Sequence, residues 1–562
     1  MDIVSRYINR DKFDSYEDFK QNFKINIPED FNFGFDVVDE WAKIEPDKKA
    51  LVWCNDDGDK KTITFSEMKK LSNQTVNFLK SLGIKKGDHI LVMLRRHYEY
   101  WICAVALHKL GAVLVPATSQ LKAKDITYRA QAANVTAVIA ADDRDLVAAI
   151  DEAAKKCPFM KYKIMCGKFR DTEGWIPFGE NIKKHSDVFE RPTGEDATHN
   201  EDMMIMYFTS GTTGYPKMAW HCYTYPLGHI ITAKFWQNVE NNKLHMTVAE
   251  TGWAKTSWGR IYGQWICGAC IFVYDYSSRF TPTDLLKKIE EYRITTFCAP
   301  PTILRFLIRE DLTKYDLSSL HYCTTAGEAL NAEIFNKFYE GTGIKIREGF
   351  GQTETVVALA NFPWIEPRPG SLGKPSPGYE VHLLNDDGED CEEGQAGKIA
   401  FRTEEMMPYG LFRGYYNDEE KTEECWHDGY YYPGDIAWCD EDGYYWYVGR
   451  SDDMIKSSGY RIGPFEVESA LMEHPSVLEC AVTALPDDIR VQIVKATIVL
   501  NKGYEPSEEL IKELQEHVKK TTAPYKYPRV VEFTESLPKT ASGKIMRTVI
   551  RDNDLRKRGL IR

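Results

Sequence analysis

The order of apolar runs constrains the fold of this chain more than any other feature. Short apolar runs alternate with stretches whose apolar residues recur at helical spacing. In chain order, the expected strands and helices cover residues 89–94, 98–110, 112–115, 125–133, 135–140, 145–156 and 162–165. Strands that alternate with helices of this length indicate βαβ units and a parallel sheet.

The same alternation returns after a polar, turn-rich link at 192–200. The expected strands and helices there cover residues 203–208, 296–299, 301–310, 321–325, 332–339 and 344–347. Beyond Pro363 the chain is rich in Gly and Pro, and its short alternating runs favour a more antiparallel subdomain. After Arg450, two strand-like runs followed by a helix at 507–520 indicate a small α+β domain.

The chain is acidic, with 562 residues and a formal net charge of −13. This balance argues against nucleic acid or an anionic membrane as the main partner, although a local basic pocket for a phosphorylated ligand is compatible with it. No stretch approaches the roughly 20 apolar residues of a membrane span. Residues 1–20 resemble neither a secretory signal nor a transit peptide. We therefore expect a cytoplasmic protein, and the sequence leaves its oligomeric state open.

The 13 cysteines are scattered along the chain. Cys267 and Cys270 form one Cys-x-x-Cys unit, but no second unit completes a zinc-like pair. Because this unit lies inside the apolar run 265–273, core packing is favoured over a redox role.

A loop suited to phosphate follows the apolar run 203–208. Its sequence is Thr209-Ser-Gly-Thr-Thr-Gly-Tyr-Pro-Lys217. Glycines allow close backbone approach, hydroxyls add donors and Lys217 supplies a positive charge, which together suit a polyphosphate. The spacing does not fit the P-loop pattern, because the lysine follows a proline. Taken alone, the composition of this loop favours an ordinary polar surface turn over a phosphate site.

Together with six later motifs, this loop resembles the acyl-CoA synthetase branch of the adenylate-forming enzymes, and most closely the medium-chain acyl-CoA synthetases. The resemblance extends from about Gln120 to Arg547, with the motifs in the order of that family. The later motifs are Thr325-Ala-Gly-Glu-Ala329, Glu348-Gly-Phe-Gly-Gln-Thr-Glu354, Tyr432-Pro-Gly-Asp435, Gly449-Arg-Ser-Asp-Asp453, Ser458-Gly-Tyr-Arg-Ile-Gly-Pro464 and Leu537-Pro-Lys-Thr-Ala-Ser-Gly-Lys544.

The resemblance implies an ATP site assembled from these motifs. Its nucleotide-binding residues would be Gln120, Thr209, Ser210, Gly211, Thr212, Thr213, Gly214, Lys217, Gly327, Glu328, Glu348, Gly349, Phe350, Gly351, Gln352, Asp435, Arg450 and Arg461. Among these, Gly327 and Glu328 would lie along one face of adenine and Phe350 along the other. Asp435 would accept hydrogen bonds from the ribose hydroxyls.

The resemblance also implies three catalytic residues. Thr353 would bind the α-phosphate, and Glu354 would hold Mg²⁺, a hard cation that bridges phosphate oxygens. Lys544 would serve the first step, because a carboxylate that attacks a phosphate needs a cation between the two anions.

CoA would be bound by the small domain. The matching residues are Ser458, Gly459, Tyr460, Arg490, Tyr527, Pro528 and Arg529. In this family the small domain rotates between the two steps, and Asp452 matches the hinge. We therefore predict an α/β chain whose large N-terminal domain, residues 1–450, has doubly wound sheets and a β-rich subdomain. A small mobile α+β C-terminal domain would cover residues 451–562.

The acyl pocket departs from the pattern of medium-chain enzymes. The residues expected to line it are Trp236, Trp253, Lys255, Trp258, Cys298 and Gly351. Indoles and a lysine would fill volume where an open channel is usual, which favours a short, branched or compact aromatic acid. Alternatively, Lys255 points away and the tryptophans belong to the core.

The expected activity is therefore ATP-dependent formation of an acyl-adenylate from a carboxylic acid, followed by transfer to CoA. Three rivals remain at this point: an adenylation enzyme that loads a carrier protein, a luciferase-like oxidative enzyme, and a catalytically inactive nucleotide sensor. Intact Lys544, Thr353 and Glu354 argue against the sensor. The CoA-type residues argue against the carrier-loading enzyme, as does Glu250 where an amino-acid enzyme usually has aspartate.

Overall fold

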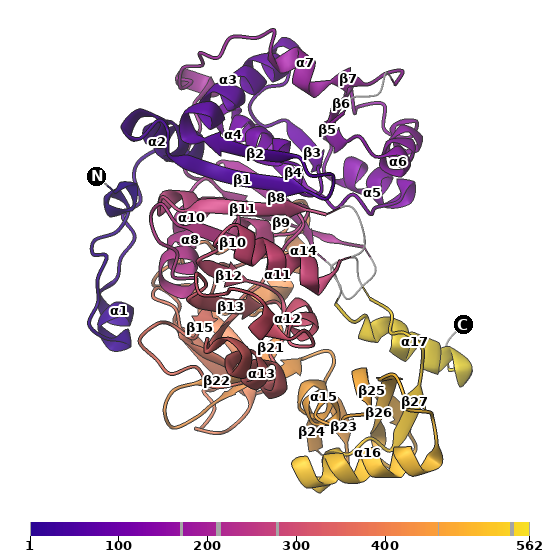
Figure 1. Cartoon of the computed structure of the whole chain (residues 1–562). Helices are drawn as coiled ribbons and strands as arrows, with labels where there is room; N and C mark the ends of the chain where they lie inside the picture. The colour runs from indigo at the N-terminus through magenta and orange to yellow at the C-terminus, as the bar shows by residue number, and fades with distance from the viewer. Residues whose placement is uncertain are drawn as a thin grey trace.

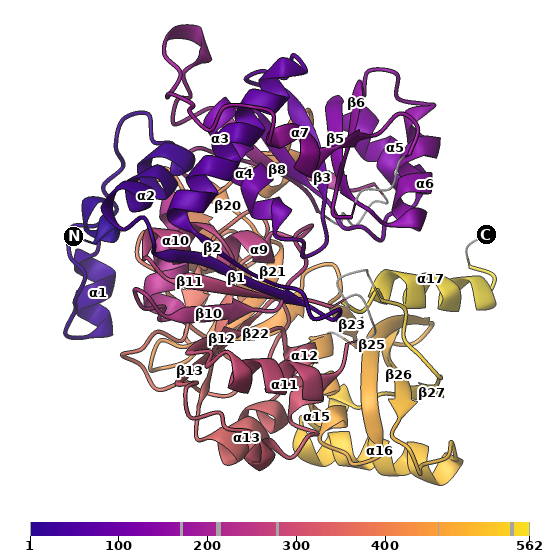
Figure 2. The same ribbon diagram turned by 45° about the horizontal axis from the view of Figure 1, so that its top comes forward.

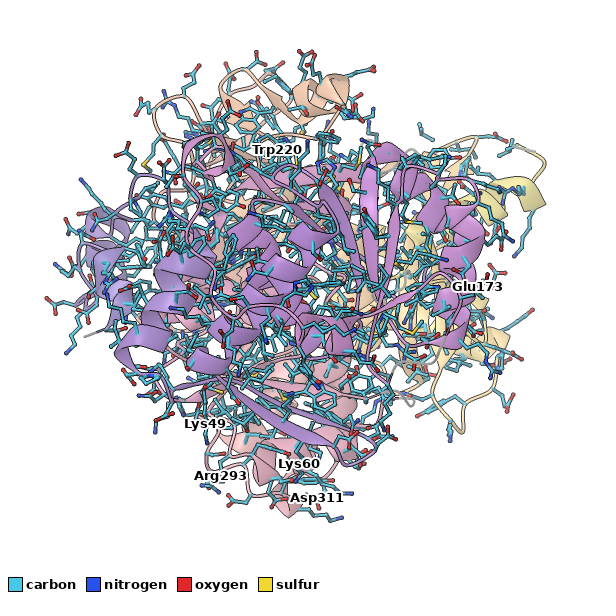
Figure 3. All side chains as sticks on the ribbon, turned by 90° about the horizontal axis from the view of Figure 1, so that it is seen from above. Lys49, Lys60, Glu173, Trp220, Arg293 and Asp311 are labelled. Carbon is cyan, nitrogen blue, oxygen red and sulfur yellow. The ribbon has the colours of Figure 1, made fainter. Side chains whose placement is uncertain are left out.

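The structure, a computed structural model, describes residues 2–168, 172–209, 215–276, 280–458, 460–539 and 544–560. These residues form three β-sheets with flanking helices. Figures 1 and 2 show the first two sheets against each other, with the third sheet and its helices standing beside them near the C-terminus. Charged side chains such as Lys60, Arg293 and Asp311 lie at the periphery (Figure 3).

The first sheet has the strand order β7-β6-β5-β3-β4-β8-β9, and only β9 runs antiparallel to its neighbour. Its strands are β3 His89–Met93, β4 Val113–Pro116, β5 Val135–Ala141, β6 Tyr162–Cys166, β7 Ile176–Pro177, β8 Met203–Thr209 and β9 Lys217–Cys222. The helices of this region are α3 Phe65–Ser81, α4 Glu99–Leu110, α5 Ala123–Ala132, α6 Arg144–Ala154 and α7 Phe178–Ile182. The alternation predicted for residues 89–165 is confirmed, with each end correct to within about two residues.

Local signals explain where these helices begin and end. Helix α3 begins with a capping box, in which Thr64 and Glu67 each accept the backbone N–H of the other residue. Helix α4 ends at Gly111, whose φ of 84° suits glycine better than any side-chain-bearing residue. Asp143 caps α6 by accepting the N–H groups of the first helical turn.

The second sheet joins a parallel half to an antiparallel half. Its path is β19-β20-β18-β21-β22-β16-β15-β14-β13-β12-β10-β11-β1-β2, and β17 pairs with β18. The half around the parallel centre comprises β1 Lys49–Asn55, β2 Lys60–Thr64, β10 Leu244–Thr247, β11 Cys270–Asp275, β12 Thr296–Cys298, β13 Tyr322–Ala326 and β14 Ile346–Phe350. Its helices are α8 Tyr225–Ile230, α9 Lys255–Gly259, α10 Tyr262–Ile266, α11 Pro282–Glu291, α12 Pro301–Leu307 and α13 Ala332–Thr342.

The antiparallel half contains β15 Leu359–Ala360, β16 Ser371–Pro375, β17 Val381–Leu384, β18 Gly397–Arg402, β19 Trp426–His427, β20 Tyr430–Tyr431, β21 Asp435–Cys439 and β22 Tyr445–Arg450, with helix α14 Glu419–Cys425. The antiparallel subdomain predicted beyond Pro363 is therefore confirmed. Strands β1 and β2, by contrast, were not predicted. They extend the sheet through parallel pairing of β1 with β11, a strand more than 200 residues later in the chain.

The third sheet is a five-stranded unit near the C-terminus, with β27 added beside the path β24-β23-β26-β25. Its elements are β23 Ile455–Ser457, β24 Tyr460–Ile462, α15 Pro464–Met472, β25 Val477–Asp487, β26 Val491–Leu500, α16 Glu508–Thr521, β27 Val530–Phe533 and α17 Arg547–Lys557. Its apolar residues form a core cluster of their own. The predicted small α+β unit is therefore present.

The N-terminal segment packs on the second sheet through aromatic side chains. Helix α1, Tyr16–Asn22, brings Phe19 into contact with Phe235 and Trp364 at ring-centroid distances of 4.6 and 4.9 Å. In the described part of the chain, no helix is long and apolar enough to cross a membrane.

Cys267 and Cys270 lie in the core, between α10 and the start of β11. Burial raises the pKa of each thiol to about 12. Both side chains therefore stay protonated near neutral pH, as expected for core residues and not for a redox pair.

Candidate active site

Three adjacent parallel strands end at one edge of the second sheet, and candidate residues lie at these ends or directly after them. Strand β12 ends at Cys298, β13 at Ala326 and β14 at Phe350. Residues 327–328 and 351–354 come directly after two of these ends. Ligands of open parallel sheets bind beyond the carboxyl ends of the strands, so this edge is the candidate site.

One wall of the site is a hydrogen-bonded network around Asp435. The Gln352 amide donates to Asp435 Oδ2 at 2.7 Å, and the Tyr447 hydroxyl donates to Asp435 Oδ1 at 3.2 Å. Arg450 Nη1 lies 3.4 Å from Asp435 Oδ2. The Tyr431 hydroxyl donates to Gln352 Oε1 at 3.0 Å and fixes the orientation of the amide. These hydrogen bonds hold the side chains of the wall in place relative to one another.

Burial determines the acidity of Asp435. It raises the pKa of this carboxyl to about 6, although Arg450, the Tyr447 hydroxyl and the Gln352 amide act in the opposite direction. The carboxyl is thus close to half protonated at mildly acidic pH. The positive charge of Lys544 also favours its ionised form.

Lys544 comes from a distant part of the sequence. Lys544 precedes α17 in the C-terminal unit, yet its charge acts on Asp435 and also lowers the pKa of Lys255. The structure therefore brings Lys544 to the edge of the second sheet. The catalytic role of Lys544 stays a prediction.

The loop that suggested phosphate binding connects β8 to β9. Thr209 and Lys217 pair across this antiparallel hairpin. The predicted residues Ser210, Gly211, Thr212, Thr213 and Gly214 lie outside the described residues. Among those described, none donates to or accepts from Thr209 Oγ1, which is buried. A buried hydroxyl of this kind calls for a partner, which the described residues do not supply.

Lys217 and Glu354 are connected through a tyrosine. Lys217 Nζ donates to the Tyr415 hydroxyl at 3.0 Å, and this hydroxyl donates to Glu354 Oε1 at 2.8 Å. Lys217 Nζ also lies 4.1 Å from the centre of the Tyr415 ring. Lys217, predicted to bind phosphate, and Glu354, predicted to bind the metal ion, are therefore linked by Tyr415, which the sequence did not indicate.

The segment after β13 is hydrogen-bonded to a buried carboxyl, that of Glu348. Glu348 Oε1 accepts the Leu330 N–H at 3.1 Å, its second oxygen has no partner among the described residues, and burial raises the pKa of Glu348 well above its usual value. Gly327 has a φ of 102°, and a Cβ there would meet nothing within 4 Å. Glu328 accepts from the Thr302 hydroxyl at 2.9 Å. The space beside Gly327 is therefore open, as stacking of an adenine ring there would require.

Two indoles press against the glycines of the 348–354 motif. A Cβ on Gly349 would lie 2.6 Å from Trp236, and one on Gly351 would lie 2.5 Å from Trp258. The two indoles meet edge to face, with centroids 6.0 Å apart. Both are buried, so they occupy space directly beside the motif.

Lys255 turns toward the site. It lies on α9, and its Nζ donates to the Ala326 carbonyl at the end of β13 at 3.0 Å. Burial lowers the pKa of Lys255, while the nearby Cys298 thiol and Glu328 raise it. Lys255 therefore does not point away from this edge, whereas Trp236 and Trp258 do belong to the hydrophobic core, as the alternative expected. Trp253 lies two residues earlier and is half-buried.

Three further candidates, Thr353, Phe350 and Gln120, have different surroundings. The Thr353 carbonyl accepts a hydrogen bond from His221 Nε2 at 2.8 Å, and burial lowers the pKa of His221 to about 3, so this imidazole is neutral. Phe350 is half-buried at the end of β14. Gln120 is exposed in the loop after β4.

The residues predicted to bind CoA gather on the C-terminal unit. Arg490 Nη1 donates to the Ser458 hydroxyl at 3.1 Å, and Arg529 donates to the Tyr527 hydroxyl. Tyr460 stacks on Tyr525 with centroids 4.0 Å apart. The Pro528 carbonyl accepts from Gln515, and Gly459 lies outside the described residues.

Arg461, predicted to approach ATP, has a different partner. It forms an ion pair with Asp386, in the turn after β17 of the large second sheet. Asp386 also lies 3.4 Å from Lys398. The structure therefore places Arg461 at the junction of the C-terminal unit with the second sheet, engaged by a carboxylate.

A magnesium ion fits the chemistry of this edge. In the described ranges, no group of three or more His, Cys, Asp or Glu side chains could hold a metal ion alone. Magnesium, however, is commonly held by one or two carboxylates together with substrate phosphates. Glu354, buried beside the phosphate-type hairpin, supplies one such carboxylate.

The sequence reasoning missed four residues of the site: His221, Tyr415, Tyr431 and Tyr447. Tyr431 directly precedes the motif 432–435, so its position was within reach of the sequence. Tyr447 lies in residues 444–448, one of the short alternating runs beyond Pro363, where side chains of alternate residues share a face. His221 and Tyr415 have no local signal, because their partners are distant in the chain.

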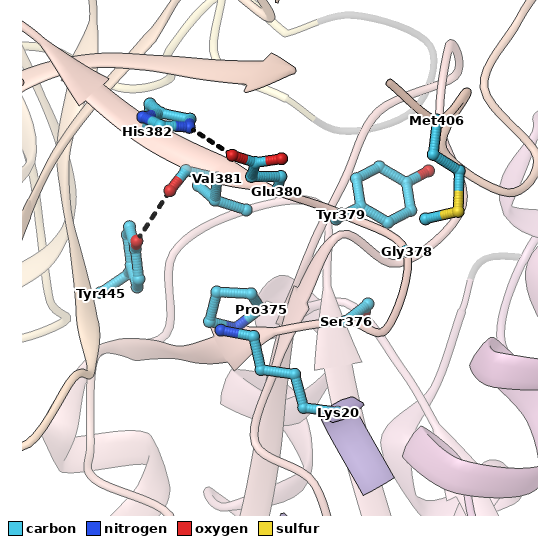
Figure 4. A pocket seen from close by; sticks show the side chains of 10 residues that line it. All are labelled: Lys20, Pro375, Ser376, Gly378, Tyr379, Glu380, Val381, His382, Met406 and Tyr445. Carbon is cyan, nitrogen blue, oxygen red and sulfur yellow. Dashed lines mark hydrogen bonds and ion pairs between the residues drawn. The ribbon is translucent and has the colours of Figure 1, made fainter. Parts of the chain in front are cut away.

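A pocket of about 330 Å³ lies elsewhere, over the antiparallel half of the second sheet. Figure 4 shows its lining, which includes Lys20 from α1, Tyr379, His382 and Tyr445. His382 lies between Glu380 and Asp390, at 3.2 and 2.8 Å. The pocket shares no lining residue with the candidate site.

Comparison with known proteins places these features in a family. The AMP-binding enzyme family matches residues 38–416, and the AMP-binding enzyme C-terminal domain matches residues 466–544. Mouse "Acyl-coenzyme A synthetase ACSM3, mitochondrial" is 44% identical and covers 97% of this chain and 93% of its own length. Human "Acyl-coenzyme A synthetase ACSM4, mitochondrial" is 41% identical, with 95% and 92% covered.

Solved structures agree over nearly the whole chain. The anthranilate CoA ligase AuaEII, in complex with anthranoyl-AMP, has a TM-score of 0.86 at 30% identity and covers 95% of this chain and 99% of its own. A benzoate CoA ligase from Burkholderia xenovorans has a TM-score of 0.80 at 27% identity, with 93% and 100% covered. This chain belongs to the AMP-binding, adenylate-forming enzyme family, within its acyl-CoA synthetase branch.

Proposed function

We propose that this AMP-forming ligase activates a short, branched or compact aromatic carboxylic acid and transfers it to CoA. In the first step the acid's carboxylate attacks the α-phosphorus of ATP, which forms acyl-adenylate and releases pyrophosphate. In the second step the thiol of CoA attacks the acyl carbon, loses its proton and displaces AMP. The observation that carries the proposal is that two of the family motifs come together at one sheet edge, where the Gln352 amide donates to Asp435 Oδ2 at 2.7 Å.

The nucleotide would bind along the polar wall of this edge. Asp435 would accept the ribose hydroxyls, with Arg450 beside it, and Lys217 would neutralise phosphate charge. Lys544 would lie between the attacking carboxylate and the α-phosphate, where it stabilises charge that develops in the transition state. Thr353 would donate to the α-phosphate. Glu354 would hold a magnesium ion, which would supply neutralisation of the charge on the pyrophosphate leaving group.

The acid would lie against Trp236 and Trp258. These buried indoles press on Gly349 and Gly351, which supports a compact acid over a long straight chain. Two similar proteins support the same direction, since one is an anthranilate CoA ligase and the other a benzoate CoA ligase, both named for compact aromatic acids. Cys298 and Lys255 would complete the pocket, with Trp253 at its border.

We also propose that residues 1–450 and 451–562 move relative to each other about Asp452. Asp452 lies 3.4 Å from Arg450, and its carbonyl accepts from Arg551 of α17 at 3.5 Å. Rotation would replace Lys544 at the site by the CoA residues of the same unit. Asp452→Pro should block thioester formation while adenylation continues, and equal loss of both steps would contradict the hinge.

The alternative acceptor, a carrier protein, has less support. An amino-acid substrate needs a carboxylate for its ammonium group, and Glu250 is the nearest candidate. Glu250 Oε1 already accepts from the Thr118 hydroxyl at 2.8 Å and from the Ser119 N–H at 3.1 Å. The cytoplasmic location stays a prediction, since the relatives cited above are named as mitochondrial.

A screen of CoA-dependent AMP release tests the proposal. The acids would run from acetate to dodecanoate, with branched acids, benzoate and 2-aminobenzoate alongside. We expect the highest kcat/KM for acids with at most about six carbons or one ring. A maximum at long straight chains would overturn the substrate class, and AMP release without CoA acylation would overturn the acceptor.

A further inference from the structure

We propose that Tyr415 is a positioning residue that holds the Glu354 carboxylate ready for the metal ion and couples it to Lys217. The inference rests on the proposed function, which assigns magnesium to Glu354. Its starting point is the chain in which Lys217 Nζ donates to the Tyr415 hydroxyl at 3.0 Å and that hydroxyl donates to Glu354 Oε1 at 2.8 Å. This bond orients the carboxylate through one oxygen and leaves the other for the ion.

The backbone around Tyr415 is tied to the strand that carries Lys217. Tyr415 forms an isolated antiparallel bridge with Ala219 of β9, and the Tyr416 N–H donates to the Met218 carbonyl at 2.8 Å. The segment 413–416 thus runs alongside β9 as a short extra strand. The distance between the Lys217 and Tyr415 side chains is set by this pairing.

The same segment also fixes Glu354. The Phe412 N–H donates to the Glu354 carbonyl at 2.8 Å, so the backbones of both residues are joined. On its other side, the Tyr415 N–H donates to the Thr422 hydroxyl at 2.9 Å. Tyr415 is therefore held by three neighbouring segments, and its hydroxyl has little freedom to leave Glu354.

The charges around Tyr415 favour a neutral hydroxyl that links Lys217 to Glu354. Burial raises the pKa of Tyr415, and the negative charge of Glu354 raises it further, so the phenol keeps its proton. A neutral hydroxyl that receives a hydrogen bond from a cation becomes a stronger donor to a carboxylate. Lys217 over the face of the Tyr415 ring adds a cation–π contact.

Groups that orient metal ligands commonly change metal affinity by about 10- to 100-fold when they are removed. Loss of the Tyr415 hydroxyl would free the Glu354 carboxylate to rotate and would leave Lys217 without its acceptor. Both effects weaken the response of ATP binding to magnesium. Binding of ATP without the metal should change far less, because Tyr415 has no direct phosphate role in this arrangement.

The test compares ATP binding by titration calorimetry in saturating Mg²⁺ and in EDTA, without acid or CoA. The ratio of the two affinities measures what the metal contributes. We expect Tyr415→Phe to reduce this ratio by about tenfold or more. The matched control is Tyr444→Phe, because Tyr444 has the same 6% exposure as Tyr415 but donates its hydroxyl to the Glu366 carbonyl at 2.9 Å; its ratio should stay at the wild-type value.

Glu354→Gln separates this inference from the proposed function. If Glu354→Gln loses the magnesium response while Tyr415→Phe keeps it, the positioning role is wrong and the metal role of Glu354 stands. If Glu354→Gln keeps the full response, the metal assignment is wrong and the positioning role falls with it. The acid screen reports on the overall reaction independently of both outcomes.

Discussion

The two sides of the candidate site are held together by different kinds of interaction. On the nucleotide side, polar groups already bond to one another, as Gln352 and Tyr447 do with Asp435 at 2.7 and 3.2 Å. On the acyl side, Trp236 and Trp258 meet edge to face and press against glycine backbone. One side is a network of hydrogen bonds and the other is close packing.

This contrast predicts two kinds of mutational effect. A buried polar network is costly to leave partly unpaired, so changes there should impair ATP binding whatever acid is present. Close packing selects by volume, so changes there should reorder the acids and leave ATP binding nearly unchanged.

The largest effect is expected from Lys544→Ala. Removal of one preorganised charge-stabilising donor from an active site costs about 10²- to 10³-fold in rate. Acid-dependent ATP–pyrophosphate exchange should therefore fall by about that factor, and by the same factor for every acid. Lys539→Ala is a control on the same segment, since Lys539 pairs with Glu479 within the C-terminal unit. Loss that depended on the acid would break the division.

The next effect is expected from Trp258→Leu. Loss of the indole opens space beside Gly351, so longer straight acids should gain in kcat/KM relative to short ones. One methylene of pocket volume is worth about 10- to 200-fold in selectivity. The chain-length profile of acyl-CoA formation measures this, with the KM for ATP as internal control.

Trp438→Leu provides the comparison for that experiment. Trp438 stacks on Trp446 in the antiparallel half of the sheet, with centroids 5.6 Å apart. The substitution removes an indole of the same size without touching the glycine motif. An unchanged order of acids in Trp258→Leu, or an equal change in Trp438→Leu, would contradict volume selection at Trp258.

A smaller effect should appear as pH dependence at Asp435. Because the pKa of its carboxyl is about 6, protonation converts an acceptor for ribose hydroxyls into a neutral acid as the pH falls. The Kd for ATP should therefore rise by about tenfold between pH 7 and pH 5. Titration calorimetry across this range measures it, and Asp435→Asn should bind weakly with a flatter profile. Parallel profiles in the two proteins would exclude Asp435 as the titrating group.

Much of the fold follows from local patterns. The run 135–140 became β5, and residues 332–339 became part of α13, because short apolar runs and helical spacing each match one kind of element. Strands β1 and β2 were missed, since their stability comes from pairing with β11, which lies far away in the sequence. Long-range pairing of this kind leaves no local trace.

The site divides in the same way. Asp435 and Gln352 could be predicted because they lie in motifs with a recognisable order, and the structure brings them within hydrogen-bonding distance. Tyr415 could not, because its function depends on the segment 413–416 running beside β9. The motif 458–464 also suggested that Arg461 faces ATP, whereas in the folded chain Arg461 pairs with Asp386, in the turn after β17 of the second sheet.

That partner yields the smallest predicted effect. The ion pair between Arg461 and Asp386 is exposed on both sides, and exposed pairs contribute about 0.2–1 kcal/mol. If Asp386 competes with ATP for Arg461, Asp386→Asn should lower the KM for ATP by up to about fivefold, equally for all acids.

Salt distinguishes this competition from a simple loss of stability. High ionic strength screens exposed pairs, so it should reduce the difference in KM between wild type and Asp386→Asn. Glu366→Gln, which breaks the surface pair of Glu366 with Lys345, is the matched control and should leave the KM for ATP unchanged. A higher KM in Asp386→Asn would mean that Asp386 holds Arg461 in place for the nucleotide, and that the polar side of the site extends into the C-terminal unit.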